Sequence, residues 1–204
     1  MRKYEFTGET KVFLNKTLHR IRAVVDFGTV HAGDVGGWIE KEENLNHCGD
    51  AWIYGNAKVY GDTEVGGNAK VYGDACVYGD AKVGGDACVY GDAWVGGNAE
   101  VYGNAEVYGD AEVGGDTWVY GNAKVYGNAC VYGSTRVGGN AKDYGSAQFY
   151  ACACVYGNAE VYGNAKVGGD AKVYGGKWEK SPCFIQGTRW SINISSPNTV
   201  RCGC

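Results

Sequence analysis

An unbroken six-residue repeat runs through most of this chain. From Cys48 to about Gly175 the sequence cycles through twenty-one copies of V-Y-G-[ND]-A-x, with no residue gained or lost between copies. An aliphatic residue recurs every six positions from Ile53 to Val173, and Asp143 and Phe149 are the interruptions of that row. One such unit cannot bury its own apolar face, so repeats of this kind stack into a solenoid.

Each unit divides into a short strand, A-x-V, and a corner, Y-G-[ND]. Successive side chains of a strand point to opposite faces, so Ala and Val share the inner face and x lies outside. Gly tolerates positive φ, and Asn and Asp tolerate the left-handed region better than other residues. An apolar spacing of two and four, with a Gly in every unit, excludes a helix. The pattern predicts an all-β, single-stranded parallel β-helix.

Two patterns in the repeat indicate three strands per turn, which makes a coil of 18 residues. At the other two corners Gly replaces some tyrosines, but one corner keeps its tyrosine throughout; we call this set the Tyr column: Tyr54, Tyr72, Tyr90, Tyr108, Tyr126, Tyr144 and Tyr162. The same spacing places opposite charges on adjacent coils at x in four pairs: Glu64–Lys82, Lys82–Glu100, Glu106–Lys124 and Lys142–Glu160. We expect about seven such coils.

Three regions follow from the frame of the repeat: an N-terminal β cap at residues 1–47, the β-helix at 48–175 and a C-terminal cap at 176–204. Caps are expected because an open solenoid end exposes unpaired backbone. Within the first cap, residues 20–27 and a stretch around 11–14 read as strands. We expect Trp38, Trp178 and Trp190 to cover the ends of the valine stack.

The repeat V-x-G-[ND]-A-x, as in residues 101–106, resembles that of the hexapeptide-repeat (trimeric LpxA-like) superfamily. It is similar in particular to the YdcK-like and prophage-encoded repeat proteins, whose leaders resemble residues 4–10 and 34–40 and whose later part resembles residues 185–189. The resemblance implies a left-handed helix, trimers, and in many members acyltransferase activity with a His as general base. It also implies that relatives continue beyond Cys204.

Composition narrows the class of partner and the compartment. The net charge is −4 and the acids and bases are mixed, which gives no electrostatic case for nucleic acid or an anionic membrane. The first residues lack the apolar core of a signal peptide, and no run reaches transmembrane length. Nine cysteines without a secretion signal predict reduced thiols and a cytoplasmic protein. The alternative is a phage or secreted particle protein that is exported without a cleavable signal.

Few residues could carry out chemistry. The three histidines, His19, His31 and His47, all precede the repeat, and no loop interrupts the coils. His47 lies immediately before the first coil and is the candidate catalytic base; the alternative is a capping or surface role. The sequence contains no nucleophile-elbow or phosphate-loop motif, and we expect no cofactor.

Three further sets are candidates for binding. The Tyr column could stack sugars or pack subunits, against the simpler alternative of corner packing. Asp74, Asp92 and Asp110 recur at one corner and could attract Ca²⁺ or Mg²⁺, but Asp alternates with Asn there as a turn residue does, so no metal is expected. Cys183, Cys202 and Cys204 could form a metal site, although cap thiols are the simpler interpretation.

Asp143 occupies a position where valine should point inward. A lone buried carboxylate is costly, so we expect a distorted coil with Asp143 turned outward; the alternative is that it marks a site. Taken together, the sequence predicts a non-catalytic structural or interaction protein that self-associates as a trimer, with the Tyr column as the candidate contact. The alternative is an acyltransferase-like enzyme acting on a sugar or acyl-CoA substrate, by superfamily analogy alone.

Overall fold

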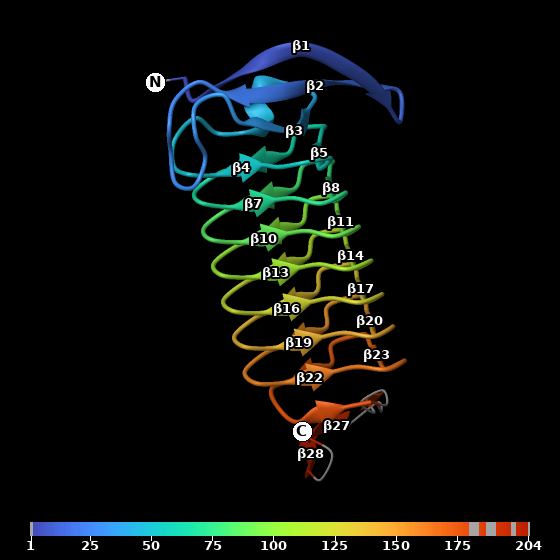
Figure 1. The fold of residues 1–204 in the computed structure, drawn as a ribbon. Helices are drawn as coiled ribbons and strands as arrows, with labels where there is room; N and C mark the ends of the chain where they lie inside the picture. Colours follow the sequence, from blue (N-terminus) through green and yellow to red (C-terminus); the bar gives the residue numbers. More distant parts are fainter. Residues whose placement is uncertain (1, 180–183, 187–190, 197–198, 204) are drawn as a thin grey trace.

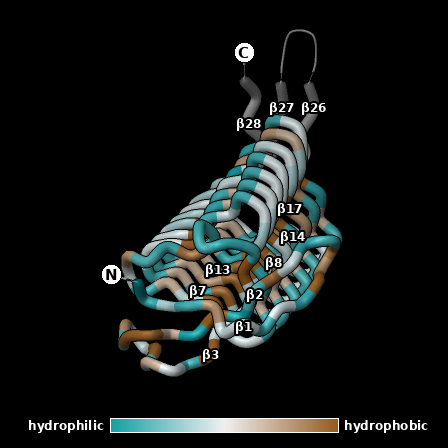
Figure 2. Tube along the Cα trace, turned by 90° about the horizontal axis from the view of Figure 1, so that it is seen from above, coloured by the Kyte–Doolittle hydropathy of each residue, from teal (hydrophilic) through white to brown (hydrophobic). Residues whose placement is uncertain are grey.

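Short parallel strands stack coil upon coil along one axis and form three flat faces around a shared interior (Figures 1 and 2). This computed structural model describes residues 2–179, 184–186, 191–196 and 199–203. Strand register advances by 18 residues, as where Cys88 pairs with Lys70 on one side and Glu106 on the other. The predicted fold class and coil length are confirmed. Because one face carries eight strands, the solenoid has about eight turns rather than seven.

We number the faces in the order in which the chain reaches them, and each corner takes the number of the face before it. Face 1 contains β4 (Trp52–Ile53), β7 (Lys70–Val71), β10 (Cys88–Val89), β13 (Glu106–Val107), β16 (Lys124–Val125), β19 (Lys142–Asp143), β22 (Glu160–Val161) and β25 (Lys177–Trp178). Face 2 contains β5 (Lys58–Val59), β8 (Cys76–Val77), β11 (Trp94–Val95), β14 (Glu112–Val113), β17 (Cys130–Val131), β20 (Gln148–Phe149) and β23 (Lys166–Val167). Face 3 contains β6 (Glu64–Val65), β9 (Lys82–Val83), β12 (Glu100–Val101), β15 (Trp118–Val119), β18 (Arg136–Val137), β21 (Cys154–Val155) and β24 (Lys172–Val173).

The interior is a stack of valines with Ala or Thr beside them, and nearly all of these side chains are fully buried. Each buried valine contributes about 1.5–3 kcal/mol before entropy costs. Between coils, backbone N–H groups donate to carbonyls at ordinary lengths, for example from Tyr90 to Val107 at 2.9 Å. The continuous backbone ladder and the apolar stack together hold the solenoid.

Glycine is required at the corners for two reasons. Gly73 and Gly91 both have φ of 73°, in the left-handed region. A Cβ built on Gly73 would also come within 2.9 Å of the carbonyl oxygen of Gly91, so the coils could not stack as closely. Ala151 occupies the same corner position and keeps φ of 59°, which is a strained conformation for a residue with a Cβ.

The N-terminal cap extends face 2 with antiparallel strands. Strands β1 (Tyr4–Phe13) and β2 (Lys16–Ala23) form a hairpin, β3 (Val35–Ile39) pairs with β2, and a short 3₁₀ helix, η1 (Glu42–Asn44), follows. The strand expected at residues 20–27 therefore begins and ends earlier, and residues 11–13 are the end of β1. Since β3 also pairs in parallel with β5, coil-like stacking begins ahead of the hexapeptide frame.

The aromatic residues expected at the solenoid ends have different outcomes. Trp178 is 6% exposed and packs on the core, as predicted, and its indole N–H donates to the Gly175 carbonyl at 2.8 Å. The prediction for Trp38 is wrong, because it pairs with the outward Lys58 and the ammonium of Lys11 lies 4.1 Å from its ring centre. Tyr4 and Trp52 are buried at that end instead. Trp190 lies outside the described residues.

Beyond β25 the described backbone forms an antiparallel sheet of β26 (Phe184–Gln186), β27 (Ser191–Ser196) and β28 (Thr199–Gly203). The register shortens to 17 residues where Glu160 pairs with Lys177, so the strict period ends there. In the part of the chain that the structure describes, no helix has the length and apolar character needed to cross a bilayer.

Asp143 points into the interior, so the predicted distortion is wrong. Strand β19 keeps its register between Val125 and Val161, and the Tyr126 N–H donates to the Asp143 carbonyl oxygen at 2.9 Å. The Asp143 side chain is fully buried, and neither carboxyl oxygen has a hydrogen-bond partner. The backbone ladder holds the position regular while the side chain bears the cost.

Candidate functional site

The Tyr column forms a ladder of stacked rings at corner 1. Successive ring centres lie 4.7 Å apart from Tyr72 to Tyr90 and from Tyr90 to Tyr108, with the planes within 3° of parallel. Stacking continues through Tyr126 and Tyr144 to Tyr162. Tyr54 stands apart from this ladder: it packs beside the N-terminal cap, where its hydroxyl lies 3.3 Å from that of Thr29. The ladder therefore offers ring edges and hydroxyls rather than ring faces.

Charged groups beside the ladder pair as the 18-residue spacing predicts. The Lys124 ammonium donates to Glu106 at 2.7 Å, and the Tyr90 hydroxyl donates to the other carboxylate oxygen at 3.0 Å. The Lys124 hydrogen bond lowers the pKa of Glu106, whereas burial and the same carboxylate raise the pKa of Tyr90. Lys142 and Glu160 also form an ion pair, at 3.4 Å. These contacts tie corner 1 together internally.

Corner 3 is built differently, because glycine interrupts its tyrosines. Tyr102 lies over Gly84 of the preceding coil, so that a Cβ on that glycine would be 2.5 Å from the ring. Tyr120 lies over Gly138 of the following coil, where a Cβ would be 2.7 Å away. Two tyrosines on adjacent coils thus lean in opposite directions. Each glycine accommodates a ring from a neighbouring coil, which explains the replacements seen in the sequence.

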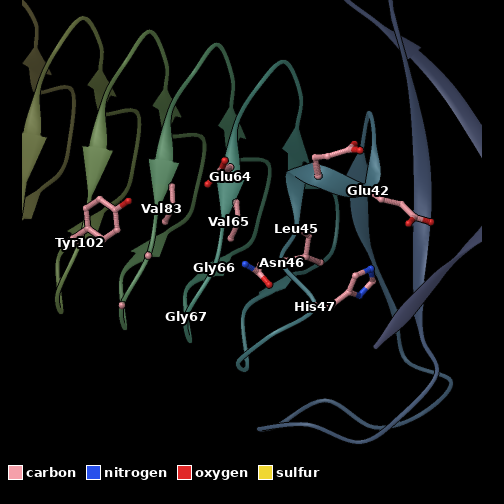
Figure 3. A pocket seen from close by; sticks show the side chains of 13 residues that line it. Glu42, Leu45, Asn46, His47, Glu64, Val65, Gly66, Gly67, Val83 and Tyr102 are labelled. Atoms are coloured by element: carbon pink, nitrogen blue, oxygen red, sulfur yellow. The ribbon is translucent and has the colours of Figure 1, made fainter. Parts of the chain in front are cut away.

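The first hollow at this corner, which we call the cap hollow, has a volume of about 540 Å³ (Figure 3). His47 lies at its cap end and Tyr102 at the far end. Gly66 and Gly84 contribute no side chain to fill it, and Leu45 and neighbouring valines supply apolar surface. Three carboxylates also line it: Glu42, Glu43 and Glu64.

A second hollow of about 520 Å³, the aromatic hollow, lies beyond Tyr102 on face 3. Trp118 is 46% exposed there, and the guanidinium of Arg136 lies 5.6 Å from its ring centre. The remaining lining residues are Glu100, Tyr102, Tyr120 and Tyr156. Tyr102 is the wall between the two hollows, since it lines both. We call the two hollows together the corner groove.

His47 offers a hydrogen-bond donor rather than a base. Its Nδ1 accepts the backbone N–H of Lys3 at 3.3 Å, and the ring of Tyr4 stacks on it at 4.5 Å. Burial, followed by the positive charges of Lys3 and Arg2, lowers the pKa of His47. The neutral ring consequently carries its proton on Nε2. A general base needs its free lone pair directed at the substrate, and here the lone pair is occupied.

The structure does not assemble a metal centre from the predicted candidates. Asp74, Asp92 and Asp110 lie exposed at corner 1, directly after tyrosines of the ladder. Over the described residues, no group of three or more His, Cys, Asp or Glu side chains is placed to hold a metal ion. Six cysteines have described side chains, and all six are free thiols. The side chains of Cys183, Cys202 and Cys204 lie outside the described residues.

The sequence contained one signal for the corner groove that the prediction did not use. Glycine replaces tyrosine at corner 3 on two successive coils, at Gly66 and Gly84, immediately after the cap. Two missing rings in succession leave a hollow that a single ring, Tyr102, covers only in part. The aromatic hollow depends on the direction in which each ring leans, and the identity of the residues does not specify that direction.

Three flat faces, hexapeptide strands and glycine corners define a hexapeptide-repeat β-solenoid. Residues 123–139 match the family described as YdcK Beta solenoid repeat. Over 62 residues the chain is 40% identical to a protein of Escherichia coli (strain K12) named "Uncharacterized acetyltransferase YdcK". That match covers 26% of this chain and 19% of the relative, so less than a fifth of the relative's length is represented. The repeat and the fold fit a hexapeptide-repeat, YdcK-like protein.

Proposed function

We propose that this protein is a non-catalytic interaction scaffold that binds a partner in the corner groove. The observation that carries the proposal is the state of His47, whose lone pair is occupied by the Lys3 backbone N–H in the hollow where a base would be needed. The coils supply no other histidine. The groove has the features of a recognition surface: exposed Trp and Tyr, an Arg, and carboxylates on a rigid frame.

The alternative function is acetyl transfer, which is favoured by the name of the E. coli relative. An assay for thiol release from acetyl-CoA, with sugar and amine acceptors, separates the two. A scaffold should give only the background rate, and His47→Ala should leave that rate unchanged. Acetyl-CoA-dependent thiol release that His47→Ala abolishes would overturn the scaffold proposal.

Self-association as a trimer through corner 1 is part of the same proposal. The ladder there exposes tyrosine edges and hydroxyls in a straight row, which suits packing against an identical row. Native mass spectrometry should then show three times the chain mass of 21.7 kDa. A species of one chain mass at micromolar concentration would contradict the trimer. We also propose a cytosolic location, supported by the six free thiols, which fractionation of the native host would test.

A further inference from the structure

The corner groove changes its chemistry along its length, from acidic at the cap to aromatic on face 3 (Figure 3). We propose that its partner is an extended peptide segment with a basic residue at one end, followed by prolines in the polyproline II conformation. This inference rests on the proposed function and names the class of partner that the groove takes.

The cap hollow selects for positive charge. Glu42, Glu43 and Glu64 line it, and no Lys or Arg is among its described lining residues. Arg2 forms an ion pair with Glu42 from outside that lining, which leaves Glu43 and Glu64 without a cation from the lining itself. Since His47 is neutral, it does not offset the carboxylates. A Lys or Arg side chain of a partner would complement this end.

The aromatic hollow suits a flat apolar ring. Tyr102 and Tyr120 lean away from each other over Gly84 and Gly138, so a slot lies between them beside the exposed Trp118. In the ladder of corner 1, by contrast, the rings cover one another's faces. Proline rings pack on exposed aromatic faces, and the polyproline II helix is already extended, so binding costs little conformational entropy.

The dimensions of the groove agree with a short polyproline II segment. Glu64 at the acidic end and Arg136 at the aromatic end are separated by four coil spacings on face 3. At roughly 4.8 Å per coil the distance is about 19 Å. Polyproline II advances about 3.1 Å per residue, so about six residues span the groove. A phosphate-bearing ligand would place its negative charge against the carboxylates, and a neutral oligosaccharide would leave them unpaired.

The test is a fluorescence anisotropy titration with two labelled peptides, Arg-(Pro)₆ and Glu-(Pro)₆, at low ionic strength. We expect the full chain to bind the arginine peptide more tightly than the glutamate peptide. Tyr102→Ala and Trp118→Ala should each weaken binding at least about tenfold, because aromatic anchors dominate such interfaces. Glu64→Gln should weaken the arginine peptide about threefold and leave the glutamate peptide no weaker.

A matched control is Trp94→Ala, which removes a 38% exposed tryptophan from face 2, outside the groove. It should leave both affinities unchanged, and the thermal midpoint of every variant should be recorded to show that it is folded. No saturable binding of either peptide at millimolar concentration would overturn the inference. So would peptide binding that Tyr102→Ala and Trp94→Ala reduce equally.

Parallel titrations with cellohexaose, followed by tryptophan fluorescence, separate failure of the inference from failure of the proposed function. Binding of the sugar but not of the peptides, lost in Trp118→Ala, would overturn the peptide class and keep the scaffold. Acetyl transfer that depends on His47 would instead overturn the scaffold itself.

Discussion

Corners 1 and 3 are made from the same hexapeptide and differ in whether tyrosine is continuous. At corner 1 each ring from Tyr72 to Tyr162 stacks on the next, and hydroxyl and charged groups pair within the chain. At corner 3 glycine breaks the row, the rings lean over the gaps, and two hollows open. A corner with every tyrosine satisfies itself, whereas a corner with some of them removed exposes aromatic surface to a partner.

The largest expected effect concerns the defect beneath corner 1. Ring centres lie 4.7 Å apart at Tyr90 and Tyr108 but 5.2 Å apart from Tyr144 to Tyr162, next to the buried Asp143. Asp143→Val should restore the apolar stack and raise the free energy of unfolding at pH 7 by about 3–5 kcal/mol, since it removes an unpaired buried carboxyl. Urea denaturation measures this, and a change below about 1 kcal/mol would show that the carboxyl is accommodated at little cost.

That stabilisation should also depend on pH. Burial raises the pKa of the Asp143 carboxyl well above its usual range, so the folded protein holds the proton. Unfolded aspartate has a pKa of about 3.9. The stability of the wild type is therefore retained below about pH 4 and lost as pH rises toward the folded pKa, by up to about 1.4 kcal/mol per pH unit. The isosteric Asp143→Asn should not show this slope; an equal slope in both proteins would assign it to other groups.

The next effect compares one tyrosine from each corner. Tyr108 is stacked on both sides, so Tyr108→Ala should lower the free energy of unfolding by about 1–3 kcal/mol. Tyr102 is 38% exposed and covers only Gly84, so Tyr102→Ala should cost less than about 1 kcal/mol. Thermal unfolding of the two variants gives the ranking. If Tyr102→Ala were the more damaging, corner 3 would be a structural element rather than an open one.

The smallest effect tests whether glycine, rather than tyrosine, sets the corner geometry. Ala151 holds φ of 59° where the other described corners place glycine. Ala151→Gly should raise the unfolding free energy by about 1 kcal/mol, because glycine adopts this conformation without strain. Gly109→Ala should destabilise by at least as much, since its Cβ would meet Gly127 at about 3.0 Å. A stabilising Gly109→Ala would contradict the requirement for glycine.

The solenoid could be predicted from sequence because its determinants are local and repeat. Val and Ala at fixed spacing specify the inner face, glycine specifies the corner, and the constant Tyr column together with the Glu106–Lys124 pair specifies the 18-residue coil. Asp143 could not be placed in this way. Side-chain cost favoured an outward position, but the backbone ladder on both sides of β19 fixes the inward one.

The candidate site was less accessible to prediction for a related reason. Composition revealed His47 and the glycine replacements, but the role of His47 depends on the Lys3 backbone N–H, which the fold of the cap brings to it from 44 residues away. The groove likewise depends on how Tyr102 and Tyr120 lean. Contacts of this kind follow from tertiary structure and leave no periodic pattern in the sequence.

The contrast between the two corners can be measured directly by mapping amide chemical shifts during titration with Arg-(Pro)₆. The account predicts shifts at Gly66, Tyr102 and Trp118 that saturate together, while the ladder from Tyr72 to Tyr162 stays unchanged. Shifts confined to the ladder, or none at millimolar peptide, would contradict the claim that the glycine-interrupted corner is where this protein binds its partner.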